Sequence, residues 1–414
     1  MRVAAPLLLL LSHPLSPSAY VHLNVIDFGA VGDNATDCTA AFRGALAAAA
    51  AAGGGQVRVP APGVYQTAPF NLTSNVDFRV EGTVFGVADA GRFPWVAPLP
   101  SYVSEAPGPR RHPLVWAVGA RNVSVSGPGV IDGGGPYWWP DFFNASDASR
   151  PHLVEVHACQ GVEISGVTLR NAAYWTLRPV YSLHVHIHDM RIEAPWCENY
   201  ACANDDGIDV DSSSHVLVER NAIACGDDHV TVISGAGESG RAWGMPSRNV
   251  TVVDNVLGTG MGLSVGSSVS GGVGDVLFAR NGMAEGRGEW GLGAHLKTRV
   301  AYGGWVRNVT WRDSVFSAVT STGMQIETDY QSSGGCNASA CTHISGIAFI
   351  NLTIVGPTAP GAFDCFPNAP CENVTWRDVR VVNASDAAWD CKNVASGSVH
   401  NVFPGGLAQA CGLR

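Results

Sequence analysis

The segments Val162-Glu163-Ile164 and Leu183-His184-Val185-His186-Ile187 each alternate apolar and polar residues, as half-buried strands do. Eight further segments show the same alternation, each after a turn residue: 57–59, 76–80, 123–125, 216–218, 250–252, 276–278, 309–311 and 374–376. The steps from Val162 to Leu183 and from Val250 to Val276 fall within the period of about 20–50 residues that is typical of repeat proteins. Strand repeats without helices between them favour a parallel β-helix, with an immunoglobulin-like or jelly-roll sandwich as the rival.

One helix is predicted, near the N-terminus. Thr36 or Asp37 caps it, Phe42 and Leu46 form its apolar face, and an alanine run continues it until three glycines end it at residues 53–55. This helix caps the solenoid. The fold class predicted is therefore all-β, a solenoid with a short N-terminal capping helix.

Composition and charge narrow the function. Of the 414 residues, 46% are hydrophobic and 14% are charged, against about 25% charged in an average soluble protein. The net charge of −10 argues against nucleic acid and anionic membranes as partners, because both are bound through basic patches. Only two of the 25 basic residues are lysines, Lys297 and Lys392. An anionic ligand therefore needs a local basic site.

The N-terminus is typical of a secreted protein. Arg2, the apolar run at residues 6–11 and the small residues Ser18-Ala19 predict a signal peptide, residues 1–19, cleaved near Ala19 or Tyr20. Residues 20–414 are then a single domain, expected to be a monomer. No later segment approaches the roughly 20 apolar residues of a membrane span. Ten Asn-x-Ser/Thr sequons fit a glycosylated extracellular or cell-wall protein; their asparagines are Asn34, Asn71, Asn122, Asn144, Asn249, Asn308, Asn337, Asn351, Asn373 and Asn383.

Eleven cysteines leave at least one thiol without an intrachain partner. Three pairs lie close enough in sequence to staple loops, namely Cys197–Cys202, Cys336–Cys341 and Cys365–Cys371, and Cys202–Cys225 competes with the first. The spacings match no zinc site, and no metal or other cofactor is expected.

Clustered carboxylates carry the strongest functional signal. The chain reads Asn204-Asp205-Asp206-Gly207 and then Gly226-Asp227-Asp228. Asp206 and Asp227 are separated by the same step as Val162 and Leu183, so that three carboxylates are expected on one face of adjacent coils. Crowded carboxylates raise one another's pKa, so one serves as a general acid and another as a base. Calcium binding is the competing interpretation. Asp209 and Asp211 are interpreted as turn residues.

On these residues the chain resembles the polygalacturonase family of pectin-cleaving glycoside hydrolases, over nearly its whole mature length. The opening Asp27-Phe28-Gly29-Ala30-Val31-Gly32-Asp33 is similar to the family's N-terminal signature. Four motifs follow in the family's order. Asn204-Asp205-Asp206 resembles Asn-Thr-Asp, Gly226-Asp227-Asp228 matches Gly-Asp-Asp, Gly258-Thr259-Gly260 takes the place of Gly-His-Gly, and His295-Leu296-Lys297 that of Arg-Ile-Lys. Tyr330 lies where the family has a substrate-contacting tyrosine.

The resemblance implies a right-handed parallel β-helix that hydrolyses α-1,4-galacturonosyl bonds of pectin with inversion and without a metal. Asp227 would be the general acid, and Asp206 and Asp228 would hold and activate the attacking water. Substrate-binding roles are implied for Asn204, Thr259, His295, Lys297 and Tyr330. Arg299 joins them because His295, Lys297 and Arg299 alternate along one expected strand and so share a face.

Two positions depart from the family pattern. Thr259 replaces a histidine, and its hydroxyl carries no charge near neutral pH. His295 replaces an arginine and lacks the bidentate guanidinium fork. The departures leave a substituted or rhamnose-containing galacturonan open as substrate. A protonated His295 would bind a sugar carboxylate, which predicts an acidic pH optimum. The length of the loop after Asp228, residues 236–247, favours attack at chain ends.

Two alternatives to hydrolysis remain at this point. A calcium-dependent pectate lyase on a similar solenoid would yield an unsaturated product and stop on chelation. A degenerate, non-catalytic protein that binds the cell-wall polysaccharide would keep the groove. The intact set of Asp206, Asp227 and Asp228 argues against this binder, and the changes at Thr259 and His295 argue for it.

Overall fold

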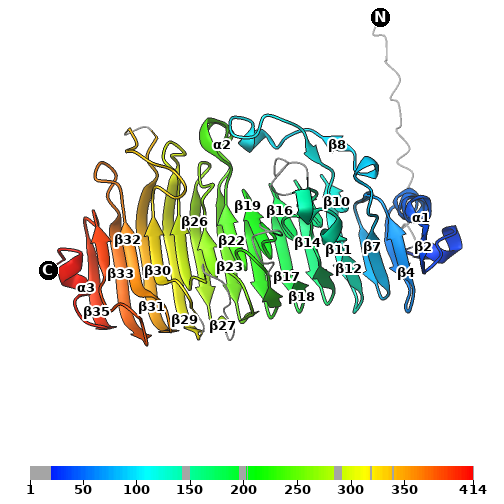
Figure 1. The fold of residues 1–414 in the computed structure, drawn as a ribbon. Helices are drawn as coiled ribbons and strands as arrows, with labels where there is room; N and C mark the ends of the chain where they lie inside the picture. The colour runs from blue at the N-terminus through cyan, green and yellow to red at the C-terminus, as the bar shows by residue number, and fades with distance from the viewer. Residues whose placement is uncertain are drawn as a thin grey trace, which may run out of the picture.

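The computed structural model describes residues 20–141, 150–194, 202, 204–283, 291–317, 319–337 and 340–413. The chain winds into an elongated parallel β-helix whose strands stack coil upon coil from the N-terminal to the C-terminal end (Figure 1). The predicted solenoid is therefore confirmed, and the sandwich alternative is excluded, because neighbouring coils pair in parallel. The predicted signal peptide lies outside the described residues.

Two parallel sheets run the length of the solenoid. The larger sheet has 22 described strands: β1 (Val21–Asn24), β2 (Asp33–Asp37), β3 (Gly55–Val59), β4 (Val64–Thr67), β6 (Val76–Val80), β7 (Thr83–Gly86), β11 (Arg121–Ser126), β12 (Val130–Asp132), β14 (Gln160–Ser165), β15 (Thr168–Arg170), β17 (Leu183–His188), β18 (Arg191–Glu193), β20 (Ser214–Glu219), β21 (Ala222–Ala224), β23 (Ser247–Val253), β24 (Val256–Leu257), β26 (Val273–Ala279), β27 (Gly282–Met283), β29 (Trp305–Phe316), β31 (His343–Val355), β33 (Glu372–Val382) and β35 (Gly397–Phe403). All ten segments predicted from alternation lie in this sheet.

The smaller sheet has 11 described strands and carries the polar residues discussed below. The strands of this sheet are β5 (Phe70–Leu72), β10 (Val115–Val118), β13 (Val154–His157), β16 (Leu177–Val180), β19 (Ile208–Asp211), β22 (Val230–Ile233), β25 (Leu263–Val265), β28 (Ala294–Lys297), β30 (Thr322–Glu327), β32 (Ala359–Asp364) and β34 (Asp390–Lys392). Short 3-10 helices lie in the connections: η1 (Val25–Phe28), η2 (Ala90–Arg92), η3 (Pro100–Tyr102), η4 (Gly135–Tyr137) and η5 (Trp139–Asp141).

The step between coils differs from the one expected around Val162. Val162 pairs with Val185, and Leu183 pairs with Gln160. The predicted pairing of Val162 with Leu183 is thus wrong by one pleat repeat, a shift that keeps apolar side chains facing inward. The predicted step from Val250 to Val276 is confirmed, because these two residues are partners in the sheet.

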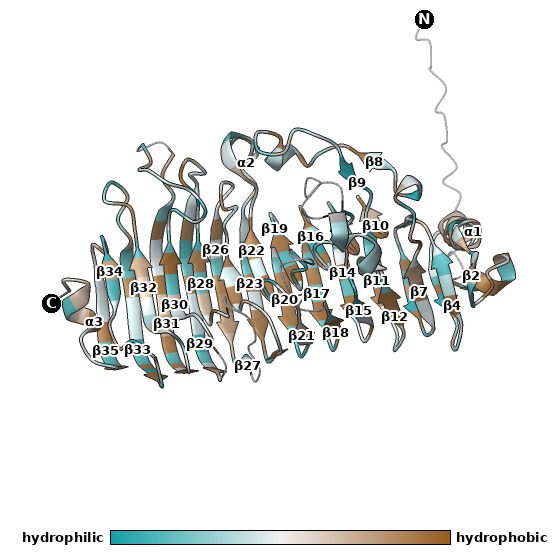
Figure 2. Cartoon of the chain, in the orientation of Figure 1, coloured by the Kyte–Doolittle hydropathy of each residue, from teal (hydrophilic) through white to brown (hydrophobic). Residues whose placement is uncertain are grey.

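Inward side chains form one continuous core between the sheets. Figure 2 shows hydrophobic residues along the strands throughout the solenoid. In the C-terminal half, aromatic rings from successive coils stack, with Trp311 centred 5.1 Å from Phe278 and 5.3 Å from Phe349. Stacking identical positions on neighbouring coils buries each ring against the next, which is how a solenoid builds a core from short repeats.

Helices cover both ends of this core (Figure 1). At the N-terminal end α1 (Thr39–Ala51) places Phe42 5.3 Å from Phe70 between ring centroids. Its N-cap residue is Cys38, one past the predicted Asp37, but Asp37 Oδ1 accepts a hydrogen bond from Thr39 N at 3.1 Å. At the other end lies α3 (Leu407–Ala410).

The cysteines confirm part of the predicted pairing. Cys336–Cys341 and Cys365–Cys371 are disulfides, and a third disulfide joins Cys391 to Cys411. Cys202 is disulfide-bonded, and its predicted partner Cys197 lies outside the described residues. Cys225 is a buried free thiol, so the competing Cys202–Cys225 pair is wrong. Cys38 and Cys159 are also free and buried.

A long excursion lies over the smaller sheet. Residues 95–111, which we call the cover segment, begin with β8 (Trp95–Val96) and end with β9 (Arg110–Arg111), paired antiparallel to it. Between them the cover segment reaches α2 (Gly237–Trp243), where Ser104 and Ser239 exchange hydrogen bonds of 2.8 and 3.1 Å (Figure 1). It forms a wall for the site described below.

Two further findings concern membrane spans and the sequons. Among the described residues no helix is long and apolar enough to cross a membrane. The sequon asparagines in the described ranges are all exposed, whereas Asn144 lies outside those ranges. Several of them, Asn122 and Asn308 among them, adopt positive φ at strand starts and hydrogen-bond to the neighbouring coil, so these asparagines also have a structural role.

Candidate active site

The smaller sheet builds the floor of the site from side chains that point outward in register. Glu155 on β13 lies opposite Arg178 on β16, and Asp209 on β19 lies opposite Thr231 on β22. Because parallel strands stack about 4.8 Å apart, one such row sets a line of polar groups along the solenoid axis. Asp209 and Asp211 belong to strand β19 and are buried, so their interpretation as turn residues is wrong.

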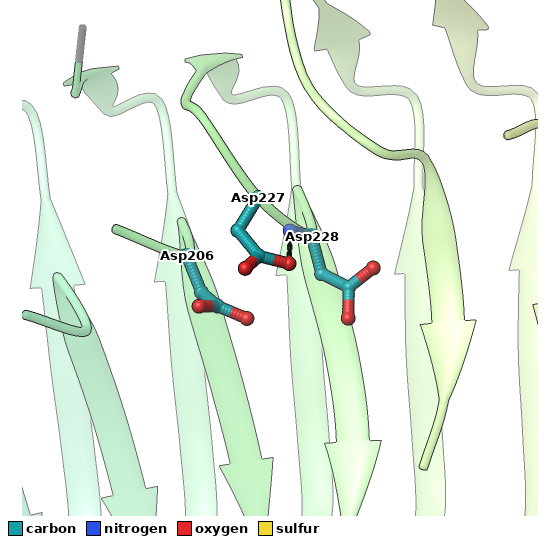
Figure 3. Close-up of side chains that lie close together, drawn as sticks. All are labelled: Asp206, Asp227 and Asp228. Carbon is teal, nitrogen blue, oxygen red and sulfur yellow. Dashed lines mark hydrogen bonds between the residues drawn. The ribbon is translucent and has the colours of Figure 1, made fainter. Parts of the chain in front are cut away.

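Three predicted carboxylates meet where β19 and β22 begin. Figure 3 shows the side chains of Asp206, Asp227 and Asp228 close together. One oxygen of each lies within 4.8 Å of the others. The register pairs Ile208 with Val230, so the residue opposite Asp206 is Asp228, not Asp227. The expected convergence holds, although the predicted step from Asp206 to Asp227 is one residue short of a full coil.

Asp228 is held by two side chains from later coils. Lys297 Nζ lies 2.9 Å from its Oδ2, and Ser264 Oγ donates to its Oδ1 at 2.6 Å. Asp227 Oδ1 accepts from the Asp228 backbone N–H at 2.9 Å (Figure 3). Asn204 Nδ2 donates to Asp227 Oδ2 at 3.4 Å. Different partners therefore orient Asp227 and Asp228, although the carboxylates of both residues lie close to that of Asp206.

The environment favours the protonated form of two of them. Burial, followed by the charge of Asp228, raises the pKa of Asp227 to about 6. Burial, followed by the charge of Asp227, raises the pKa of Asp206 well above its ordinary value. Lys297 acts in the opposite direction on both. A proton is therefore available on this cluster at mildly acidic pH.

These residues line a cavity of about 320 Å³ between the smaller sheet and the cover segment. The size lies at the lower end of the range for small-molecule sites. Its lining includes Asn204, Lys297, Arg299 and Tyr330, four of the residues for which substrate binding is predicted. Lys297 Nζ lies 4.9 Å from the Tyr330 ring centroid, and Arg299 Cζ lies 5.8 Å from it.

Thr259 and His295 do not line the cavity. His295 is buried, with Nε2 3.6 Å from Glu327 Oε2, and burial lowers its pKa. Burial thus disfavours the charged imidazole that the predicted binding of a sugar carboxylate by His295 requires.

The loop around Thr259 encloses a different histidine. His229 Nε2 lies 3.0 Å from the Gly258 carbonyl, and Gly262 N–H donates to His229 Nδ1 at 3.1 Å. A Cβ on Gly260 would come within 2.5 Å of this ring, which explains the glycine. Burial lowers the pKa of His229 to about 4. Both ring nitrogens bond backbone groups, so His229 holds the loop between Gly258 and Gly262 in place.

Sequence reasoning missed the residues at the other end of the cavity. Arg178 is buried, ion-paired with Asp211 at 2.5 Å, and 4.5 Å above the Trp175 ring centroid. Its Nε has no hydrogen-bond partner among the described residues. The cavity lining on this side also includes Arg110, Arg111, Arg150, His152 and Tyr174. Arg178 lies one coil before Asp209, but this coil is longer than its neighbours, and only the strand register reveals that the two residues are adjacent.

The carboxylate cluster is a poor fit for calcium. Ca²⁺ takes six to eight oxygen ligands. Both carboxylate oxygens of Asp228 already bond Ser264 and Lys297, and one oxygen of Asp227 bonds a backbone N–H. Lys297 holds its ammonium group 2.9 Å from Asp228 Oδ2. A cation already placed there repels a second one, so this donor set favours acid–base chemistry over metal binding.

Comparison with known proteins identifies the family of this chain. The model for glycosyl hydrolases family 28 matches residues 51–400. A probable polygalacturonase of Vitis vinifera is 29% identical over 400 residues, covering 90% of this chain and 77% of that one. An exopolygalacturonase from Thermotoga maritima superposes with a TM-score of 0.81 at 26% identity over 92% of both chains. The polygalacturonase of Erwinia carotovora gives 0.72 at 24% identity, covering 89% of this chain and 96% of that chain.

The solved neighbours confirm the predicted right-handed parallel β-helix. The family model covers most of the chain, and the resemblance seen in the four motifs is confirmed. The chain belongs to glycosyl hydrolases family 28 and is a polygalacturonase-like glycoside hydrolase.

Proposed function

We propose that this protein hydrolyses α-1,4-galacturonosyl bonds of pectin-type polysaccharide by general acid–base catalysis with inversion. The observation that carries the proposal is the cluster of Asp206, Asp227 and Asp228 in a cavity lined by basic side chains. Family membership supports hydrolysis over the calcium-dependent lyase.

Asp227 is the general acid in this proposal. Its pKa of about 6 keeps the carboxyl protonated at mildly acidic pH, so it protonates the leaving glycosidic oxygen. Asp206 and Asp228 hold the attacking water, and the cluster accepts the water's proton as the new bond forms. Lys297 stabilises the negative charge left on the cluster.

Inversion rests on the family resemblance and not on the carboxylate spacing. Inverting pairs usually stand about 6.5–9.5 Å apart, and retaining pairs about 5–5.5 Å. The distance in this cluster, one oxygen of each aspartate within 4.8 Å of the others, is a contact between nearest oxygens and is not the separation of two carboxyl groups. The anomeric form of the first product, observed by NMR during hydrolysis, decides between the two outcomes: inversion releases the β-anomer from an α-linked substrate, and retention the α-anomer.

The acidic substrate is supported by the cavity's cations. Lys297 and Arg299 lie on one side of the carboxylates, and Arg178 on the other. A polymer of uronate sugars carries one carboxylate per unit, so cations on both sides of the cleavage point can pair with its charges. A neutral glycan carries no charge with which these cations could pair. Secretion remains part of this proposal, supported by the signal-peptide pattern of residues 1–19 and the exposed sequons. The monomeric state stays a prediction.

Product analysis on a panel of pectic polysaccharides tests the proposal. We expect new reducing ends from polygalacturonate in the presence of EDTA, without an ultraviolet-absorbing unsaturated product. Loss of activity with EDTA and gain of absorbance would identify a lyase. Binding without turnover on every galacturonan, including substituted and rhamnose-containing ones, would identify a binding protein.

A further inference from the structure

One end of the cavity is closed by an ion pair between the cover segment and the floor. Arg110 donates to both carboxylate oxygens of Glu155, through Nη1 at 2.8 Å and Nη2 at 2.7 Å. Glu155 lies on β13 and is fully buried, and the Arg110 side chain is 13% exposed. The guanidinium also lies 5.5 Å above the Trp116 ring centroid on β10. Protein therefore covers the sheet face at β10 and β13.

This closure is firmly held. Glu155 Oε2 lies 3.0 Å from His152 Nδ1, so both oxygens have partners. Burial acts to raise the pKa of Glu155, but Arg110 and His152 outweigh it and hold that pKa well below its ordinary value. The neighbouring Arg111 donates to the carbonyls of Ala90 and Phe93 at 2.9 and 2.8 Å, which fixes β9. Bidentate arginine–carboxylate pairs of this kind combine strength with fixed geometry.

The closed end lies close to the reacting groups. β13 is separated from β19, the strand of Asp209, by two strand spacings, or about 10 Å. On the other side of the carboxylates the cavity continues past Lys297 to Tyr302 and Gln331. A polysaccharide that passes through the site from both sides would have to cross the Arg110–Glu155 pair.

We propose that the Arg110–Glu155 pair makes this cavity a chain-end site, so that the enzyme removes short units from one end of its polysaccharide. The inference rests on the proposed galacturonan hydrolysis. It makes Arg110 and Glu155 determinants of the mode of attack, without any part in bond cleavage.

The test compares viscosity loss with release of reducing ends on polygalacturonate, and sizes the products at the first time point. For the wild-type enzyme we expect products of one short length and little viscosity loss per bond cleaved. A spread of long oligomers with a steep viscosity loss would overturn the inference. Absence of turnover on all galacturonans would instead refute the proposed function.

A double variant, Arg110→Gly with Glu155→Gln, opens the end without leaving a buried charge unpaired. We expect viscosity loss per bond to rise several-fold and longer products to appear. Arg92→Gln is the matched control, because it breaks the Arg92–Asp37 pair of 2.8 Å outside the cavity, and it should behave as wild type. A folded double variant, shown by circular dichroism, with the wild-type product pattern would also overturn the inference. If the variant does not fold, the wild-type product sizes decide alone.

Discussion

Asp227 combines proximity to two other carboxylates with a pKa of about 6. The change Asp227→Asn removes the proton donor and keeps the shape of the side chain, so the fold should persist. We expect kcat on polygalacturonate to fall about 10²–10⁴-fold, with oligosaccharide binding largely retained. Initial rates and calorimetric titration measure the two effects. Equal turnover by the variant and the wild type would remove Asp227 from the mechanism.

The same residue sets the expected pH dependence. Because the pKa of Asp227 is raised, the carboxyl stays protonated below about pH 6 and loses its proton above it. Activity that needs the acid form should therefore decline as the pH rises through about 6. A profile of kcat/KM between pH 4 and 8 measures this decline. The residual activity of Asp227→Asn should not show the decline. A wild-type profile that stays flat to pH 8 contradicts the assignment.

At the scale of elements, strands β28 and β34 offer a matched comparison of the two lysines. Lys297 and Lys392 fall in one row, linked by Glu327 and Asp364 on the strands between. Lys297 is 7% exposed and pairs with Asp228, whereas Lys392 is 55% exposed and pairs with Asp364 at 3.1 Å. Lys297→Ala should weaken substrate binding about 10–100-fold, the value of a charge-assisted hydrogen bond. Lys392→Ala should leave KM and kcat unchanged.

Isothermal titration with oligogalacturonate, done with the Asp227→Asn background to prevent turnover, measures the loss at Lys297 directly. Circular dichroism shows whether each variant folds, because removing Lys297 leaves Asp228 without its ion pair. If both lysine variants lose affinity for oligogalacturonate to the same degree, the loss reflects the overall charge of the protein. Lys297 would then not bind the substrate directly.

The sequence predicts the elements better than it predicts their register. Alternation with turn residues locates strands such as β14 and β17, because a solenoid strand buries every second side chain. The alignment of coils is harder, since loops of different length make the step at Val162 longer than the step at Asp206. Because the register is uncertain, the sequence does not reveal that Arg178 lies beside Asp209. The position of the cover segment could not be predicted for another reason. Its sequence shows no strand or helix periodicity, and Ser239, which bonds its Ser104, lies far along the chain.

At the scale of the whole molecule, the stability of a solenoid depends on nearest-neighbour contacts between coils, and its end coils need caps. Helix α1 is the N-terminal cap, and Phe42 is its fully buried anchor against Phe70 and Phe78. Phe42→Ala should cost about 3–5 kcal/mol of unfolding free energy. The loss should act first on the coils next to α1, while the carboxylate cluster on β19 and β22 stays intact.

We therefore expect Phe42→Ala to shift the urea midpoint strongly and to leave kcat at low temperature nearly unchanged. Hydrogen exchange measured by mass spectrometry should show faster exchange in β1, β3, β4, β5 and β6, the strands that contact α1, and little change in β22. The exposed Val31, which precedes β2, provides a control, since Val31→Ala removes apolar surface that the core does not use. Uniformly faster exchange along the whole chain would show that the solenoid unfolds as one cooperative unit. In that case the cap stabilises the distant active site as much as it stabilises its own coil.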